Sequence, residues 1–297
     1  MVGTNQNRFG MLKDYIVLAR SNQKSKNGSH YAVLKVSAQK GEAHSFSVWD
    51  LDEASGPNIG DIVTLDMDVL KNVKFPKLAD CGGFRSQRKA TDADPLSALI
   101  PHPVSKASWD FCLDRLLALC SDEALVAFIN QERNELYDKY SRQTAATSVH
   151  HAFKGGLLNH TYELLSMLLA MVPSLPELKL ERCIIAIMFH DYGKLREYNP
   201  DTFEPTEYSF LMGHVYISAH VLHNKLNEAG INNSETVRIV HCVLAHHGEK
   251  EFGSPVVPCT QEAIIVSHLD NLSAKTYIVS ESANMEKNFA LGTTIVK

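Results

Sequence analysis

Histidines and aspartates recur along the second half of the chain, at intervals of roughly 20 to 30 residues. They are His160, the pair His190 and Asp191, His214, the pair His246 and His247, and Asp270. Imidazole and carboxylate groups are good ligands for divalent transition metals. Such intervals are typical of several helices that each contribute to one shared centre. The pattern therefore predicts a metal-dependent hydrolase.

The sequence around the two pairs supports this prediction. Residues 183–189 read CIIAIMF, so His190 and Asp191 end a strongly apolar, buried helix. A buried charge without a partner costs several kcal/mol, and metal ligation keeps such a carboxylate charged. His246 and His247 also end an apolar stretch, followed by the helix-stop residue Gly248. The histidines without such neighbours are interpreted as ordinary core or surface side chains: His30, His44, His102, His220, His223, His241 and His268.

Helices must position these ligands. Apolar residues at helical spacing run through 108–140, and Ser121 and Asp122 interrupt the run with residue types that favour a helix N-cap. Two helices are therefore expected in that stretch. Further helices are predicted at 160–171, 180–189, 214–228, 234–247 and 261–279. The second half of the chain should be all-helical.

The first part of the chain has the period of β structure. Strands are predicted at 15–19, 31–36, 45–49 and 62–70, separated by segments rich in Gly, Asn, Ser, Lys and Pro. Within the last of these, Leu65, Met67 and Val69 alternate with Asp66 and Asp68, which predicts a strand with one buried face. A small antiparallel barrel is the natural expectation.

Charge separates the same two regions. Residues 1–104 hold 13 Lys and Arg against 11 acids, whereas the remainder holds 16 against 23. Three prolines in 91–103 are typical of a connection. The expected fold class is α+β multidomain. An OB-fold-like barrel would occupy residues 1–90, a linker 91–104 and an all-α metal-dependent domain 105–297.

The composition argues against disorder, export and membrane insertion. The 297 residues are 44% hydrophobic and 21% charged, which suits two compact units. Neither a signal peptide nor a membrane-spanning stretch is evident. The six cysteines form no CxxC pair and sit mostly in apolar contexts, which favours reduced thiols. A cytoplasmic location is expected.

Specific sequence words carry a resemblance to a known family. His160, His190, Asp191 and Asp270 resemble the H…HD…D signature of the HD-domain phosphohydrolases. The surrounding words resemble the YhaM family: HHAFKGGLLNHT at 150–161, HDYGK at 190–194, LMGH at 211–214, AHHG at 245–248, EFGSP at 251–255 and HLDNLSAK at 268–275. In the first part, FSVWD at 46–50 and GDIV at 60–63 are similar to the strands of that family's OB-fold. The resemblance implies an OB-fold joined to an HD domain, and a 3′-to-5′ exoribonuclease.

The resemblance also implies a ligand set. His160, His190, Asp191 and Asp270 would hold one metal, while Asp191 would bridge to a second one held by His214, His246 and His247. The family suggests Mn²⁺, and such ligands would also accept Fe, Zn, Ni, Co or Mg. A metal-activated water would then hydrolyse the phosphodiester. Lys194 would neutralise phosphate charge, and His151 would orient substrate or a water.

Nucleic-acid contacts are expected from the first unit. The candidates are Trp49 as a stacking platform and the basic residues Lys71, Lys74, Lys77, Arg85 and Arg88 as phosphate contacts. The basic residues lie in a stretch with one acid, Asp80. A solvated basic surface is the alternative interpretation. The expected substrate is single-stranded RNA, with DNA as an open alternative.

Other function classes remain open from the sequence. The chain could hydrolyse free or cyclic nucleotides, although it lacks the acidic and Gly-Tyr-Pro elements of the HD-GYP family after His247. It could also bind nucleic acid without catalysis, or be a di-iron oxygenase on a similar helical scaffold. A homo-oligomer is open as well, because the apolar helices at 111–119 and 125–129 could bury an interface.

Overall fold

The computed structural model describes most of the chain as two compact units. The described residues are 12–25, 27–38, 43–51, 55–84, 87–91, 94–96, 103–146, 151, 153–175, 177–200, 203–281, 285, 287–288 and 291–296. One unit comprises residues 1–101 together with 281–297, and the other comprises residues 102–280.

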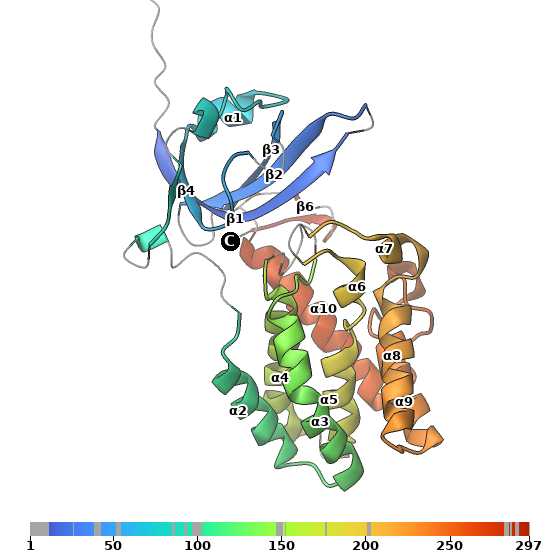
Figure 1. Ribbon diagram of the computed structural model, residues 1–297. Helices are drawn as coiled ribbons and strands as arrows, with labels where there is room; N and C mark the ends of the chain where they lie inside the picture. The colour runs from blue at the N-terminus through green and yellow to red at the C-terminus, as the bar shows by residue number, and fades with distance from the viewer. Residues whose placement is uncertain are drawn as a thin grey trace, which may run out of the picture. The chain divides into compact units, whose positions relative to one another are not determined.

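The first unit is built on a five-stranded antiparallel sheet with strand order β3-β2-β1-β4-β5 (Figure 1). The strands are β1 (Lys13–Lys24), β2 (His30–Ser37), β3 (Ala43–Trp49), β4 (Asp61–Leu65) and β5 (Arg88–Lys89). The long strand β1 pairs with β2 along most of its length and with β4 near its start, with a bulge between Val17 and Ala19. Alternate side chains such as Val17, Leu34 and Val48 fill one core.

The predicted barrel is only partly recovered. The antiparallel strands are present, but no pairing between the edge strands β3 and β5 closes the sheet within the residues that the structure describes. A closed OB-fold is therefore not confirmed.

The predicted fourth strand is wrong beyond Leu65. Asp66 accepts hydrogen bonds from the backbone N–H groups of Asp68 and Val69, and so caps helix α1 (Met67–Asn72). The alternation of apolar and acidic residues is therefore helical here, and Val69 is exposed. A short 3₁₀ turn, η1 (Gly82–Phe84), follows.

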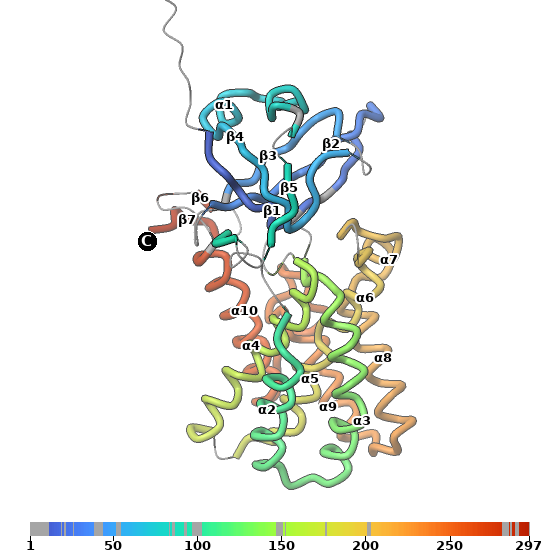
Figure 2. The backbone as a smooth tube through the Cα atoms, turned by 60° about the vertical axis from the view of Figure 1, so that its left-hand side comes forward, coloured from blue at the N-terminus to red at the C-terminus, as the bar shows by residue number. Residues whose placement is uncertain are grey.

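The second unit is a helical bundle (Figures 1 and 2). Its helices are α2 (Lys106–Leu117), α3 (Glu123–Tyr140), α4 (Gly156–Met171), α5 (Leu180–Phe189), α6 (Lys194–Glu197), α7 (Glu207–Leu211), α8 (His214–Glu228), α9 (Asn233–Leu244) and α10 (Gln261–Glu281). The short 3₁₀ turns are η3 (Val172–Ser174) and η4 (Lys250–Phe252). The predicted break is confirmed, since Asp122 caps α3 by accepting from the Leu125 N–H.

Helix α5 forms the centre of this unit. It contacts α2, α3, α4, α8 and α9, and nearly all of its side chains are buried in one large core. Burial of a leucine-sized side chain stabilises a fold by about 1.5–3 kcal/mol. A helix buried on all sides is consequently held rigidly, and so is the His190–Asp191 pair at its end.

The described residues after α10 are not helical. Two short strands, β6 (Lys287–Asn288) and β7 (Thr293–Thr294), pair with each other after α10, so the tail is an exception to the predicted all-helical half. All six cysteines are free thiols. Across the described residues, none of the helices has the length and apolar character that a membrane crossing demands.

Candidate metal centre

The His-Asp pair lies where α5 gives way to a turn. His190 is the helical C-cap of α5, and residues 190–193 turn the chain before α6 begins at Lys194. The regular helix therefore ends before the pair, and Lys194 begins a separate short helix. His190 and Asp191 are both buried, at 0% and 3% exposure. At such burial their polar atoms require partners inside the protein.

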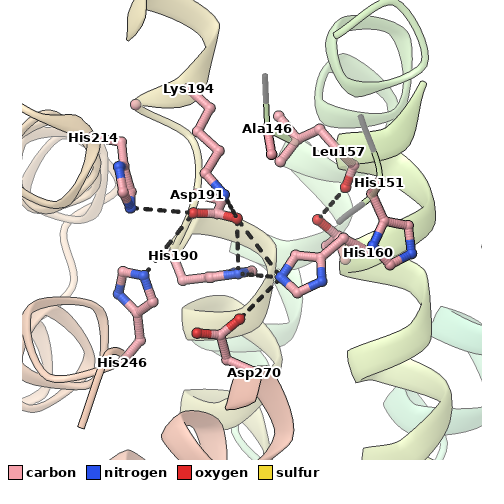
Figure 3. A network of polar contacts seen from close by, with 12 residues as sticks. Ala146, His151, Leu157, His160, His190, Asp191, Lys194, His214, His246 and Asp270 are labelled. Carbon is pink, nitrogen blue, oxygen red and sulfur yellow. Dashed lines mark hydrogen bonds and ion pairs between the residues drawn. The ribbon is translucent and has the colours of Figure 1, made fainter. Parts of the chain in front are cut away.

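The first group of ligand atoms gathers around His160 (Figure 3). His160 Nε2 lies 3.1 Å from His190 Nε2 and 3.1 Å from Asp270 Oδ1. Asp191 Oδ2 lies 3.3 Å from His190 Nε2 and 3.7 Å from His160 Nε2. Helices α4, α5 and α10 thus bring together four of the predicted ligands.

The second group consists of His214, His246 and His247. His214 is the first residue of α8, and the other two follow the end of α9. His214 Nε2 lies 3.3 Å from His247 Nε2, and the ring centres of His246 and His247 are 4.2 Å apart. The ligand atoms of His214, His246 and His247 lie within 4.8 Å of one another, and so do those of His160, His190 and Asp191, so each set is close enough to share an ion.

Asp191 faces both groups with different oxygens (Figure 3). Its Oδ2 is directed at His160 and His190, whereas its Oδ1 lies 3.6 Å from His214 Nε2 and 4.0 Å from His246 Nε2. A carboxylate between two sets of imidazoles has the geometry of a bridging ligand in a two-metal site.

All five imidazoles of the two groups have the same orientation. In each ring Nδ1 faces an oxygen atom of the protein and Nε2 faces the centre. The Nδ1 partners are Ser273 Oγ for His160, Ile187 O for His190, Glu197 Oε2 for His214, Val243 O for His246 and Phe252 O for His247. An oxygen at Nδ1 favours the tautomer that leaves the Nε2 lone pair free for a metal.

A buried atom at the centre supports the fit to a metal. His246 Nε2 is buried and has no hydrogen-bond partner among the described residues. Burial holds the pKa of His246 well below its ordinary value, with His190 and His247 acting in the same direction. Burial likewise lowers the pKa of His160 and of His247. The lowered pKa favours the neutral form of these three imidazoles, which is the form that ligates a cation, whereas Asp191 outweighs burial and raises the pKa of His190.

The carboxylates are held in the charged form. Burial by itself raises the pKa of Asp191, but Lys194 and His190 outweigh it and hold the pKa well below its usual range. Burial is outweighed at Asp270 too, where His160 lowers the pKa. Carboxylate oxygens and imidazole nitrogens together form a donor set that suits a divalent transition metal.

Lys194 forms a hydrogen bond with one of the proposed ligands, Asp191. Its Nζ donates to Asp191 Oδ2 over 2.7 Å, and the side chain is buried. The structure therefore places Lys194 at the centre, in contact with the carboxylate that lies between the two histidine groups.

His151 lies behind His160 and not at the ligand cluster itself. It is buried and has a positive φ of 50°. Its Nε2 is 3.2 Å from Glu163 Oε1. Close packing explains why residue 156 is a glycine, because a Cβ atom there would lie 1.9 Å from the His151 carbonyl oxygen.

Three supporting residues were missed from sequence. Ser273 donates to Glu163 Oε2 over 2.9 Å and faces His160 Nδ1 at 3.1 Å, while Glu197 faces His214. Ser273 and Glu163 lie three residues after Asp270 and His160, so a search along the same helix face would have found both.

The predicted nucleic-acid residues lie in the first unit. Trp49 is half-buried, stacks on Tyr31 with ring centres 4.7 Å apart, and meets the exposed Phe75 edge-on at 5.7 Å. Lys74 lies 5.6 Å from the Phe75 ring.

The basic residues predicted to contact phosphate differ in whether an acidic side chain already pairs with them. Lys71 and Lys74 are exposed and form no ion pair within the part of the unit that the structure describes. Lys77 lies 3.6 Å from Asp50, and Arg88 is held by both oxygens of Asp94. Arg85 lies outside the described residues.

A family model matches part of the helical unit, and similar proteins match about half of the chain. The family model described as HD domain matches residues 157–275. The "3'-5' exoribonuclease YhaM" of Bacillus pumilus (strain SAFR-032) is 34% identical over 152 residues, which cover 50% of this chain and 48% of that protein. The protein of the same name from Bacillus subtilis (strain 168) is 33% identical over 144 residues, covering 48% and 46%.

The extent of the similarity is limited. The chain spans about half the length of the curated relatives it matches. No solved structure matches it. Residues 157–275, which contain all seven proposed ligands, therefore match the HD-domain family model, and the chain is similar over about half its length to the YhaM exoribonucleases.

Proposed function

We propose that this protein is a metal-dependent 3′-to-5′ exonuclease acting on single-stranded RNA. The observation that carries the proposal is the position of Asp191 between two groups of histidines whose Nε2 atoms face inward. The similar proteins are named 3'-5' exoribonucleases, which supports RNA as the substrate and the direction of degradation.

Two divalent cations fit this donor set. His160, His190, Asp191 and Asp270 would hold one, and His214, His246 and His247 would hold the other, with Asp191 as the shared ligand. We propose Mn²⁺ as the first choice, since imidazole and carboxylate donors accept it along with Fe, Zn, Ni, Co and Mg. When bound, such cations polarise a phosphoryl oxygen and lower the pKa of water towards about 7, so that water attacks the phosphodiester at neutral pH.

The surrounding residues would keep the centre ready for this reaction. Lys194 stabilises Asp191 as a carboxylate and brings one positive charge to the place where a phosphate group would enter. His151 would act through Glu163 and Ser273 on the orientation of His160. We therefore assign His151 a positioning role.

The first unit would bind the single strand. An exposed aromatic ring beside a lysine is typical of surfaces on which bases stack, and Phe75 with Lys74 provides such a pair next to Trp49. A barrel of the OB type remains our proposal for this unit. A cytoplasmic location and self-association also remain predictions.

The proposal is tested with full-length protein, Mn²⁺ and a single-stranded RNA labelled at its 5′ end, with a matched DNA strand alongside. Wild-type protein should give a descending ladder of products on a denaturing gel. Asp191→Ala should give none, whereas the exposed Asp138→Ala should behave as wild type. Intact RNA with wild-type protein would contradict the proposal and turn attention to free nucleotides as substrates.

A further inference from the structure

A cavity lies beside the segment that carries Asp191. It has a volume of about 560 Å³, within the range of about 300–1,000 Å³ that is usual for small-molecule sites. Tyr192, Leu195 and Arg196 line it from the HD segment, and Lys139, Arg142 and Gln143 line it from the end of α3 and the turn that follows.

The short segment 191–197 therefore has two functional faces. Asp191 and Lys194 are buried towards the metal centre, while Tyr192 and Leu195 are half-buried and Arg196 is exposed. None of the proposed metal ligands lines the cavity. The cavity is thus separate from the centre described above, although both are built on one stretch of chain.

The cavity carries uncompensated positive charge. Among the described residues, neither Arg142 nor Arg196 forms an ion pair with a carboxylate. The Arg196 guanidinium lies over the Tyr208 ring, 5.7 Å from its centre. Lys139 is partly neutralised, because it pairs with Glu135 and donates to the Tyr192 hydroxyl over 2.9 Å. Two free guanidinium groups at one cavity are a good match for a phosphate, which they can bind through paired hydrogen bonds.

The rest of the lining is suited to a larger, mostly apolar body. The Tyr192 ring, Leu195, Pro200 and Val221 provide aromatic and aliphatic walls. Gln143 adds one specific polar group: its Nε2 donates to the carbonyl oxygens of Lys194 and Tyr198, and its Oε1 is buried with no donor among the described residues.

We infer that this cavity binds a nucleoside monophosphate, with its phosphate between Arg142 and Arg196 and its base against Tyr192. The phosphate satisfies the two guanidinium groups, and the planar base covers the aromatic and aliphatic walls. Because Gln143 also holds the backbone of Lys194, an occupant of the cavity touches the segment on which the metal centre is built.

The inference is tested by titrating adenosine 5′-monophosphate into the full-length, metal-loaded protein in a calorimeter. Arg142→Gln and Arg196→Gln should each weaken binding about tenfold, as expected for the loss of a charge-assisted hydrogen bond. Both side chains are exposed, so neither change threatens the fold. The exposed Arg238→Gln on α9 is the matched control and should bind as wild type does.

Two further ligands test the proposed division of the site. Inorganic phosphate and adenosine should each bind at least about tenfold more weakly than the monophosphate, because each lacks one half of the contacts. Wild-type affinity in the Arg142→Gln, Arg196→Gln double variant would place the ligand elsewhere, including at the metal centre, and would overturn the inference. Absence of binding at millimolar nucleotide, or equal affinity for inorganic phosphate, would overturn it too. None of these outcomes depends on whether the protein degrades RNA.

Discussion

Gly193 packs directly against the backbone of His214. A Cβ atom built on Gly193 would lie 2.3 Å from the His214 carbonyl oxygen and 2.6 Å from its Cα, closer than atoms of folded proteins approach. The Gly193 N–H also donates to Ser218 Oγ over 2.8 Å. The turn after His190 and Asp191 is thereby joined to the start of α8, so the first histidine group fixes the position of the second.

Replacing Gly193 with alanine should therefore separate the two groups. The methyl group would push the start of α8 away and move His214, and a displacement of about 1 Å at such a centre costs about 100-fold in rate. We expect the metal content to fall and RNA cleavage to drop by about that factor. Asn227→Ala, on the exposed part of the same helix, is the control. Wild-type metal content and rate in Gly193→Ala would contradict the coupling.

Ser273 should matter for metal affinity although it is no ligand. It connects His160 Nδ1 to Glu163, and loss of such a partner typically costs about 10–100-fold in metal affinity. Ser273→Ala should show this loss in a titration with Mn²⁺. Thr276→Ala removes a hydroxyl from the same helix that donates to Leu272 O, and should leave the affinity unchanged. If the two variants bind Mn²⁺ with equal affinity, Ser273 does not support the metal ligands.

The sequence predicts the ligands better than their supports. Single residues such as His160 and Asp270 are recognisable because burying an imidazole or a carboxylate on an apolar helix costs free energy unless the group has a partner or a metal. Glu163 and Ser273 carry only the weaker signal of a three-residue spacing from His160 and Asp270, since an isolated Glu or Ser on a helix is ordinarily solvated. Their role depends on how α4 and α10 pack, which is a tertiary property.

The strand prediction at Asp66 is wrong for a related physical reason. Alternation of Leu65, Met67 and Val69 has the period of a strand, but an aspartate can also cap a helix by accepting from N–H groups two and three residues later. A segment this short satisfies both patterns. Hydrogen bonding decided between them, and local sequence does not reveal the outcome.

Acid should weaken an ion pair that joins the helices bearing the ligands. Arg182 of α5 holds Glu235 of α9 by two hydrogen bonds, of 2.8 and 2.6 Å, and also contacts Glu262 of α10. The bond from Arg182 lowers the pKa of Glu235 below its ordinary 4.5, although partial burial opposes it. A carboxyl group with a lowered pKa stabilises the fold fully above its unfolded pKa, and this contribution is lost as the pH falls through the folded pKa.

Glu235→Gln tests that contribution. At pH 7 the variant should lose about 1 kcal/mol or more of unfolding free energy in urea, followed by circular dichroism of the helical unit. The difference from wild type should shrink progressively below about pH 4.5. Glu228→Gln, an exposed residue of α8, should show no loss at pH 7. A difference that stays constant from pH 7 to 3 would show that Glu235 acts through packing and not through its charge.

Phe75 should contribute to the binding of single-stranded RNA. Its ring is 57% exposed beside Trp49, and stacking of one base on such a ring is worth about 1–3 kcal/mol. Phe75→Ala should therefore weaken RNA binding about tenfold in a fluorescence anisotropy titration. Phe111→Ala removes a similarly exposed phenylalanine from α2 and serves as the control. An unchanged affinity in Phe75→Ala would argue against this surface as a stacking site.

The central claim is that Asp191 bridges two metal ions, and anomalous diffraction from crystals of the protein grown with Mn²⁺ tests it most directly. If Asp191 bridges two ions, the anomalous map should show two peaks about 3.5–4 Å apart. One should lie beside His160, His190 and Asp270, the other beside His214, His246 and His247, and a different Asp191 oxygen should contact each. A single peak, or two peaks without contact to Asp191, would contradict the claim.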